Sequence, residues 1–347
     1  GLLPRGSIPP RLHPDLVDPP WGPVYEPLLF SDRVAAVLRR LRLVGTQSKA
    51  PLVVTNGTRI NPGMALKLAE LAPGLRYKIS VGRVPAANSD GSAGSDPWSG
   101  ISLLRRMGAE VEAQVTIADS SEELVELFSY LCCSDVFRAT TTPVDWLPSE
   151  SGIMLEQRPL ALEKMLSDAA WWVARQAASG QLFDWTNMSD VVRKLYYSCR
   201  QFKPCPAGES SFALDGSGYL YPCFRFVGRR RYALGHVRSG LDEGAVAWFS
   251  RAAALSLEDH CGTCELWGLC PGRCYFALLE MPSAANPFCA FERALIAACV
   301  RISAALRHED PAAYLRVADF HYSPLEHAIQ AIGGAGRETA GVLDTTH

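Results

Sequence analysis

The cysteines of this chain are the residues whose types and spacing could do chemistry. There are eleven in 347 residues, the first is Cys132, and eight of them lie between Cys199 and Cys289. The stretch CGTCELWGLCPGRC, at 261–274, holds four of the eight, and its glycines and proline allow neighbouring sulfurs to point inward. Thiolates that share one metal centre must converge, so this crowding predicts metal ligation. Eight such ligands are enough for two centres of four cysteines each.

The spacing of the eight cysteines helps to decide between ordinary buried cysteines, zinc ligands and iron-sulfur ligands. The order is Cys199-x5-Cys205-x12-Gly218-x4-Cys223, then a gap, then Cys261-x2-Cys264-x5-Cys270-x3-Cys274-x14-Cys289. Ordinary buried cysteines have no reason to repeat at ligand spacings, which excludes packing as the role of the whole set. Zinc and iron-sulfur centres remain equally open on spacing alone, because both are held by sets of four cysteines.

Three further cysteines fall outside this pattern. Cys132 and Cys133 lie at the end of a predicted helix, and Cys299 lies within an apolar one. Small apolar side chains of this kind are among the most often buried. We therefore expect all three to serve core packing rather than ligation.

Composition and charge narrow the class of protein. The chain is 48% hydrophobic and 20% charged, which suits a globular protein with a sizeable core. A formal net charge of -2 lacks the basic excess expected of a nucleic-acid binder. No run of 18 apolar residues predicts a membrane span, and the N-terminal stretch lacks the apolar core of a signal peptide. We expect a cytoplasmic protein whose thiols stay reduced, without nucleic-acid or membrane partners.

Upstream of the cysteines, short apolar runs alternate with amphipathic segments, as βα units do. A capping signal at Ser120 or Ser121 precedes one of the predicted helices. The predicted strands cover 51–55, 77–81, 110–117 and 136–144, and the predicted helices lie near 62–72, 100–107 and 122–131. Four strands with intervening helices predict a parallel sheet or a partial barrel, and so an α/β fold.

The second half of the chain has a different pattern. Helical periodicity is strong over 158–180, and 187–199 predicts another helix that leads into Cys199. The residues 211–223 predict a β-hairpin around DGSG, and a helix is expected from 286 to 307. The polar last forty residues predict a loosely held tail.

The run from Cys199 to Cys289 resembles the SPASM domain of radical S-adenosylmethionine (AdoMet) enzymes, whose pattern is C-x9-15-G-x4-C, gap, C-x2-C-x5-C-x3-C, gap, C. The extra cysteine before the first resembles the anaerobic sulfatase-maturating branch. This resemblance implies two auxiliary [4Fe-4S] clusters. Its first cluster would be held by Cys199, Cys205, Cys223 and Cys274, and its second by Cys261, Cys264, Cys270 and Cys289.

The upstream segment resembles the barrel of the same enzymes, in which AdoMet binds at the carboxyl ends of the strands. The stretch VYEPLLF resembles the GGEP motif, so that Glu26 would contact AdoMet, and KISV resembles the fourth strand, where Ser80 would lie near the ribose. The resemblance implies a partial (β/α)6 barrel over 23–180, a SPASM domain over 187–307 and a tail over 308–347.

Three departures affect the AdoMet site. Residues 1–131 contain no cysteine, whereas AdoMet cleavage needs a C-x3-C-x2-C motif for a third [4Fe-4S] cluster. The glycines of GGEP are replaced by Val24 and Tyr25, and Gly82 and Arg83 stand where Asp and Gly are usual in the fourth strand. Either upstream residues outside this sequence supply the motif, or the protein is a degenerate member that has lost AdoMet cleavage. Both explanations stay open.

By resemblance, the expected function is maturation of a peptide or protein, as in the biosynthesis of ribosomally made peptides. A hydrogen atom would be abstracted by a 5'-deoxyadenosyl radical, with the auxiliary clusters accepting an electron or binding the substrate. The expected partners are a peptide or protein substrate and an electron donor such as a flavodoxin or ferredoxin. The alternatives are a degenerate partner subunit that keeps its clusters for electron relay or peptide docking, and a zinc-stapled interaction domain.

Overall fold

The structure is a computed structural model that describes residues 28, 31–44, 51–82, 84, 96–117, 123–143, 159–280 and 287–319. These residues fall into two compact units. One unit contains residues 200–280, and the other contains the described residues up to 199 together with 287–319.

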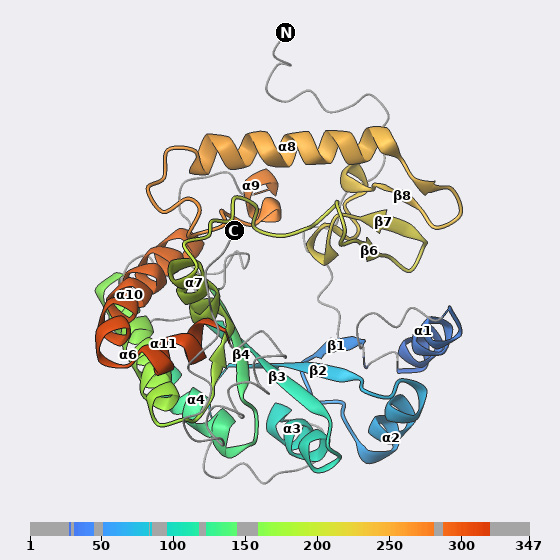
Figure 1. The fold of residues 1–347 in the computed structure, drawn as a ribbon. Coiled ribbons are helices and arrows are strands. Elements are labelled where there is room, and N and C mark those ends of the chain that lie inside the picture. The colour runs from blue at the N-terminus through green and yellow to red at the C-terminus, as the bar shows by residue number, and fades with distance from the viewer. Residues whose placement is uncertain are drawn as a thin grey trace, which may run out of the picture. The chain divides into compact units, whose positions relative to one another are not determined.

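The larger unit is built on a parallel sheet of five strands in the order β1-β2-β3-β4-β5 (Figure 1). Its strands are β1 (Leu52–Thr55), β2 (Arg76–Val81), β3 (Glu110–Ile117), β4 (Arg138–Pro143) and β5 (Asp184–Trp185). Its helices are α1 (Ser31–Val44), α2 (Pro62–Leu71), α3 (Pro97–Arg106), α4 (Leu124–Cys133), α6 (Pro159–Ala178), α7 (Thr186–Tyr196), α10 (Pro287–Glu309) and α11 (Pro311–Ala318). The predicted α/β fold with a partial barrel is confirmed.

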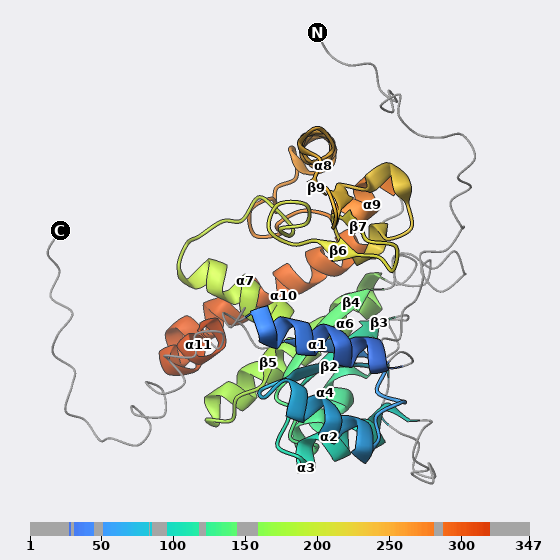
Figure 2. The ribbon, with the colours of Figure 1, turned by 90° about the vertical axis from the view of Figure 1, so that its right-hand side faces the viewer.

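The alternation of residues along the strands explains the two faces of this sheet. Helices α2 and α3 cover one face of the sheet, as Figures 1 and 2 show. On β2, the alternate residues Tyr77, Ile79 and Val81 are buried. The intervening Arg76 and Lys78 point to the opposite face, because successive side chains alternate across a strand. This opposite face, which we call the inner face of the sheet, therefore carries polar side chains. Strands of parallel sheets are usually apolar on both faces.

The helices begin where the sequence offers caps. Asn61 precedes α2, and its side chain accepts a hydrogen bond from the amide of Met64 at 3.0 Å, with Pro62 in the first turn. The turn between β1 and α2 needs Gly57, whose φ is 78°, because a Cβ there would lie 2.9 Å from the side chain of Ile79.

The C-terminal helices pack within the larger unit. Helix α10 lies against α6 and α7, and α11 lies against α7 and α6. Asp310 caps α11 by accepting a hydrogen bond from the amide of Ala313 at 2.9 Å, and Tyr314 and Val317 are buried. The residues 311–318, which the sequence analysis assigned to a tail, are thus a packed helix. Helix α10 likewise belongs to this unit, whereas the sequence analysis placed nearly all of it in the domain predicted over 187–307.

The smaller unit has an antiparallel sheet and two helices around a separate core. The sheet order is β6-β7-β8-β9, and the elements are β6 (Ala213–Leu214), β7 (Tyr219–Tyr221), β8 (Gly235–His236), β9 (Gly240–Leu241), α8 (Glu243–Cys261) and α9 (Tyr275–Glu280). The predicted hairpin is confirmed as β6 and β7. The core contains Tyr221, Phe226, Phe249 and Phe276. The long helix α8 (Figure 1) was not predicted.

Within the described residues, no helix combines the length and apolar character needed to cross a membrane.

Candidate functional site

The β-hairpin of the smaller unit positions the first part of the cysteine site. Asp215 shapes its turn, since its Oδ1 accepts hydrogen bonds from the amides of Ser217 and Tyr219, each at 2.9 Å. Strand β7 then ends at Tyr221, and Cys223 follows two residues later. The turn therefore controls where the Cys223 sulfur lies.

Gly218, the glycine of the cysteine pattern, has a structural reason to be glycine. Its φ is 94°, a left-handed conformation that other residues rarely adopt. A Cβ at this position would lie 2.7 Å from the His236 Nε2 atom and 3.0 Å from the Val237 side chain. The glycine lets β8 pack directly against the turn that leads to Cys223.

Three of the predicted ligands come together in the smaller unit. Cys205, Cys223 and Cys274 all pack against its hydrophobic core. The Cys274 thiol raises the pKa of both Cys205 and Cys223, which is the electrostatic effect of a neighbouring thiol. These are three of the four residues that the resemblance assigned to the first cluster, although they are far apart in sequence.

Burial and backbone amides act in opposite directions on these thiols. Burial is the main reason that the pKa of Cys223 rises to about 11, and the thiols of Cys274 and Cys205 raise it further. The backbone N–H groups of Arg225 and Phe226 lower the pKa of Cys223, and that of Ala207 lowers the pKa of Cys205. Amide groups directed at a sulfur favour its thiolate, which is the form that binds a metal.

The remaining cysteines of the smaller unit lie at the end of α8 and in the loop after it. Cys261 is the buried last residue of α8, and its carbonyl accepts a hydrogen bond from the Cys264 amide at 2.9 Å. The Cys270 amide donates to the carbonyl of Leu266, also at 2.9 Å. Gly272, with φ of 103°, passes close to Cys261, where a Cβ would lie 3.7 Å from the sulfur. Short turns thus keep Cys261, Cys264 and Cys270 within one short segment of the chain.

Cys199 and Cys289 belong to the larger unit and are exposed. Cys199 follows α7, and Cys289 lies in the first turn of α10. Their assignment as the fourth ligand of each cluster therefore stays a prediction.

The cysteines outside the pattern have different environments. Cys299 is fully buried in α10, as expected for core packing. Cys132 is partly buried, and burial raises its pKa to about 11. Cys133 is exposed at the end of α4, so the expectation of core packing is wrong for this residue.

The thiols do not form a closed site for one ion. Among the residues that the structure describes, no three His, Cys, Asp or Glu side chains are arranged to hold a single metal ion. Tetrahedral zinc needs four ligands around one atom, whereas a [4Fe-4S] cluster has one thiolate on each of four irons. The choice between zinc and an iron-sulfur cluster at Cys205, Cys223 and Cys274 therefore stays a prediction.

A basic segment follows the first thiols and is held by one carboxylate. Glu280, at the end of α9, accepts hydrogen bonds from Arg229, Arg231 and Tyr232. The Arg229 guanidinium also lies 5.1 Å from the centre of the Phe276 ring. These contacts attach the chain after Cys223 to the helix after Cys274.

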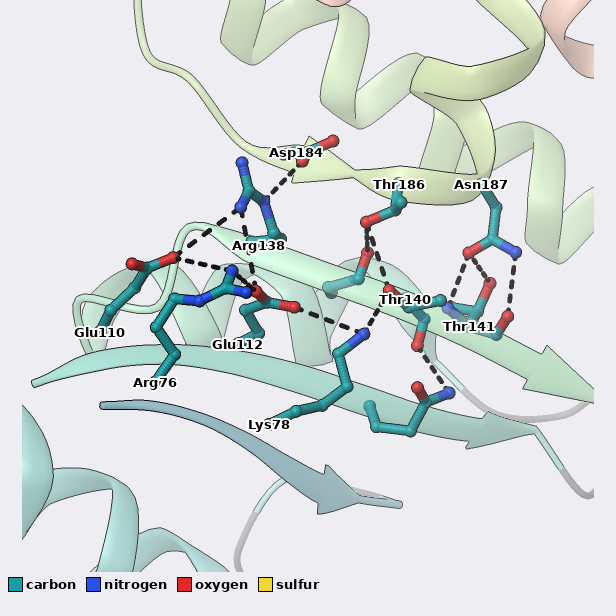
Figure 3. Close-up of polar contacts among 12 residues, drawn as sticks. Arg76, Lys78, Glu110, Glu112, Arg138, Thr140, Thr141, Asp184, Thr186 and Asn187 are labelled. Atoms are coloured by element: carbon teal, nitrogen blue, oxygen red, sulfur yellow. Dashed lines mark hydrogen bonds and ion pairs between the residues drawn. The ribbon is translucent and has the colours of Figure 1, made fainter. Parts of the chain in front are cut away.

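The inner face of the parallel sheet carries a second polar site, shown in Figure 3. Glu112 of β3 is buried and lies 3.2 Å from Arg76 Nη1 and 3.3 Å from Lys78 Nζ, both on β2. Arg138 of β4 pairs at 2.8 Å with Asp184 of β5, which is fully buried. These ion pairs cross four strands, and together with Glu110, which lies 3.7 Å from Arg76 Nη1, they set three acidic against three basic side chains.

Nearer the carboxyl ends of the strands, the lining becomes neutral. Thr140 lies within hydrogen-bonding distance of Thr186 at 3.3 Å, and Asn187 accepts from the amide of Thr141 at 2.8 Å and donates to its carbonyl at 3.0 Å (Figure 3). Ligands of α/β sheets bind at this end of the strands. Hydroxyl and amide groups there can bind polar parts of a ligand.

The two residues predicted to contact AdoMet have different outcomes. Ser80 lies on β2 on the same face as Lys78, in register with Gln114 of β3, and is partly buried. Glu26 lies outside the described residues. Neither assignment is tested, so both stay predictions.

Comparison with known proteins supports the fold. No protein-family model and no curated protein matches the chain. Among solved structures, hexahistidine-tagged anSMEcpe with bound AdoMet aligns with a TM-score of 0.60 over 88% of this chain and 82% of that chain, at 16% identity.

Two further anSMEcpe structures agree. Native anSMEcpe with bound AdoMet gives a TM-score of 0.62 at 15% identity, covering 82% of each chain. Native anSMEcpe with bound AdoMet and the Cp18Cys peptide gives 0.60 at 15% identity, covering 81% of this chain and 84% of that one. The chain thus has the fold of anSMEcpe, a radical AdoMet enzyme of the anaerobic sulfatase-maturating type.

Proposed function

We propose that this protein takes part in the post-translational modification of a peptide or protein, as a radical AdoMet protein with two auxiliary [4Fe-4S] clusters. The observation that carries the proposal is the grouping of Cys205, Cys223 and Cys274 on one core, since the first cluster requires these three together. The shared fold with structures that hold AdoMet and peptide supports the same class of activity.

The residues of the smaller unit suit an iron-sulfur cluster in chemistry as well as in place. A [4Fe-4S] cluster takes up or releases one electron at a potential set by its ligands, hydrogen bonds and exposure to solvent. Here the three thiols are partly buried against the core that contains Phe226, Tyr275 and Phe276, and backbone amides are directed at Cys205 and Cys223. The fourth ligand of the first cluster would be Cys199, and the second cluster would use Cys261, Cys264, Cys270 and Cys289.

The residues present do not fit the cluster that cleaves AdoMet. No cysteine precedes Cys132 in this sequence, so its usual ligands have no counterpart in the strands described here. No radical step is assigned to this chain's own residues. In the enzymatic form of the proposal, the lining of Thr140, Thr186 and Asn187 would bind polar groups of the ligands, and bound AdoMet would supply the chemistry for removing a hydrogen atom.

The partners follow from this class of activity. We propose a peptide or protein substrate and an electron donor such as a flavodoxin or ferredoxin, in the cytoplasm. Solved structures of anSMEcpe contain a peptide, Cp18Cys or Kp18Cys, together with AdoMet, which supports a peptide as the substrate class.

A second candidate is a partner subunit that keeps the auxiliary clusters without cleaving AdoMet. Gly82 favours this alternative, because it is exposed after β2 at the position where an acidic residue is usual in the family motif. Val24 and Tyr25, in place of the motif's glycines, point the same way. Such a subunit would relay electrons or dock the peptide.

Iron analysis of the anaerobically reconstituted chain tests the proposal. About eight irons per chain are expected for two clusters, and about twelve for three, by the ligand counts of [4Fe-4S] centres. Two zinc ions without iron would reject the proposal in favour of a zinc-stapled domain.

Release of 5'-deoxyadenosine from AdoMet under reducing conditions separates the two candidates. Release by the full-length protein supports the enzyme. Intact auxiliary clusters without release, in the full-length protein, support the partner subunit.

A further inference from the structure

Arg225 contacts two of the three grouped thiols. It lies in a short 3-10 helix, Phe224–Phe226, directly after Cys223. Its Nη1 donates a hydrogen bond to the Cys274 sulfur over 3.6 Å, and its backbone N–H acts on the Cys223 sulfur. A single residue thus links ligands that are 51 positions apart in the chain.

The surroundings hold the Arg225 side chain in place. Its guanidinium carbon lies 5.6 Å from the centre of the buried Phe276 ring, two residues after Cys274. The neighbouring Arg229 and Arg231 bond to Glu280. Within this segment, Arg225 is therefore the arginine that donates a hydrogen bond to a ligand sulfur.

The physical effect of such a contact has a definite sign. Reduction adds one negative charge to a cluster that already carries negative thiolates. A guanidinium beside a ligand sulfur stabilises added negative charge, and it stabilises it more strongly where apolar groups exclude water. Hydrogen bonds to the ligands shift potentials in the same direction.

We propose that Arg225 raises the reduction potential of the cluster held by Cys205, Cys223 and Cys274, through its hydrogen bond to Cys274. Arg225 is a positioning and tuning residue, not a ligand. The electron that enters the oxidised cluster comes from a chemical reductant or from an electron-donor protein, and no proton or bond change accompanies it. This inference rests on the proposed clusters.

The test is a redox titration of the full chain after anaerobic reconstitution, followed by electron paramagnetic resonance. The variants are Arg225→Gln, Arg225→Lys and, as a control, Arg238→Gln, which removes an exposed arginine of the same unit. The signal of the first cluster is identified as the one missing from Cys223→Ser. Iron content is measured on each sample.

With iron unchanged, Arg225→Gln should lower the ratio of reduced to oxidised first cluster about tenfold at a fixed potential, which equals about 59 mV for one electron. Arg225→Lys keeps the charge and should fall between Gln and the wild type, while Arg238→Gln should match the wild type. Equal potentials for Arg225→Gln and the wild type would overturn the inference.

Two outcomes concern loading rather than potential. If Arg225→Gln loses iron, Arg225→Met provides a second neutral side chain of similar length. The reduction potential of the first cluster in Arg225→Met is then compared with that of the wild type. Loss of the first cluster in both neutral variants, with Arg225→Lys loaded, would mean that the arginine holds the cluster instead of tuning it, and would overturn the inference. Absence of iron from the wild type would instead reject the proposed clusters themselves.

Discussion

Glu292 of α10 is a partly buried acid among charged neighbours of α7. Burial raises its pKa to about 7, and Asp190 raises it further, while Lys194 lowers it. The Cys299 thiol lies on the same helix and interacts with Glu292. The carboxyl therefore keeps its proton in the folded state at pH values where the unfolded chain has lost it.

The sign of the resulting pH dependence follows from proton binding. Between about pH 5 and pH 7 the folded chain binds more protons than the unfolded chain, so the free energy of unfolding falls as the pH rises. From the shift of the Glu292 pKa, the total loss is on the order of 3 kcal/mol. Urea unfolding monitored by circular dichroism at several pH values measures it.

Glu292→Gln should remove this fall, whereas Glu309→Gln, at the exposed end of α10, should retain it. A Glu292→Gln variant with the same slope as the wild type would show that another group titrates.

At the level of elements, Gly218 lets strand β8 close against the hairpin turn. Replacement by alanine brings a Cβ to 2.7 Å from His236 Nε2 and imposes an unfavourable φ. We expect Gly218→Ala to destabilise the smaller unit by about 2 kcal/mol, by the usual cost of such backbone strain. The midpoint of cluster bleaching in urea measures the change.

Gly216 of the same turn is the matched control. A Cβ on Gly216 would meet no atom within 4 Å, so Gly216→Ala should leave the midpoint nearly unchanged. Equal midpoints for both variants would contradict the role given to Gly218.

The ion pairs on the inner face connect the strands of the parallel sheet. Glu112→Ala should destabilise the larger unit by about 3 kcal/mol, because Arg76 and Lys78 would lose a buried partner. Glu110→Ala removes a carboxylate that is 54% exposed and should cost no more than about 0.5 kcal/mol. Urea unfolding followed by tryptophan fluorescence compares them, and similar losses would contradict a structural role specific to Glu112.

The elements that the sequence predicted well are those with local signals. Strands such as β2 show alternation, and the hairpin has the turn residues Asp215 and Gly218. Strand β5 has only two residues, so it shows no alternation, and its place depends on the distant partners Arg138 and Thr141. Tertiary contacts of this kind are not visible in local patterns.

Two missed helices did carry signals. Asp242 caps α8 by accepting a hydrogen bond from the Ala245 amide at 3.0 Å, and Asp310 with Pro311 starts α11. Their positions in the sequence explain why they were not predicted. Helix α8 lies between two groups of cysteines in the pattern, and α11 lies next to a polar C-terminal stretch.

For the whole molecule, the cysteine spacing predicted a set of candidate ligands but not the residues that surround them. The assignment of Cys205, Cys223 and Cys274 to one cluster followed from the family resemblance and stays a prediction, and in the folded chain the thiols of Cys274 and Cys205 raise the pKa of Cys223. Arg225 was not predicted, because its contact with Cys274 depends on how the hairpin segment packs near α9. The division into units also differs from the predicted bounds, since α7 and α10 pack together.

The central claim is that two clusters are held by interleaved cysteines, with Cys274 serving the cluster of Cys223 and Cys270 serving the other. Electron paramagnetic resonance of the reduced, iron-loaded variants Cys274→Ser and Cys270→Ser tests it most directly, with Cys223→Ser and Cys261→Ser as references. We predict that Cys274→Ser loses the signal that Cys223→Ser loses, and that Cys270→Ser loses the signal that Cys261→Ser loses. Loss of the same signal from Cys274→Ser and Cys270→Ser, with the other retained, would contradict the claim.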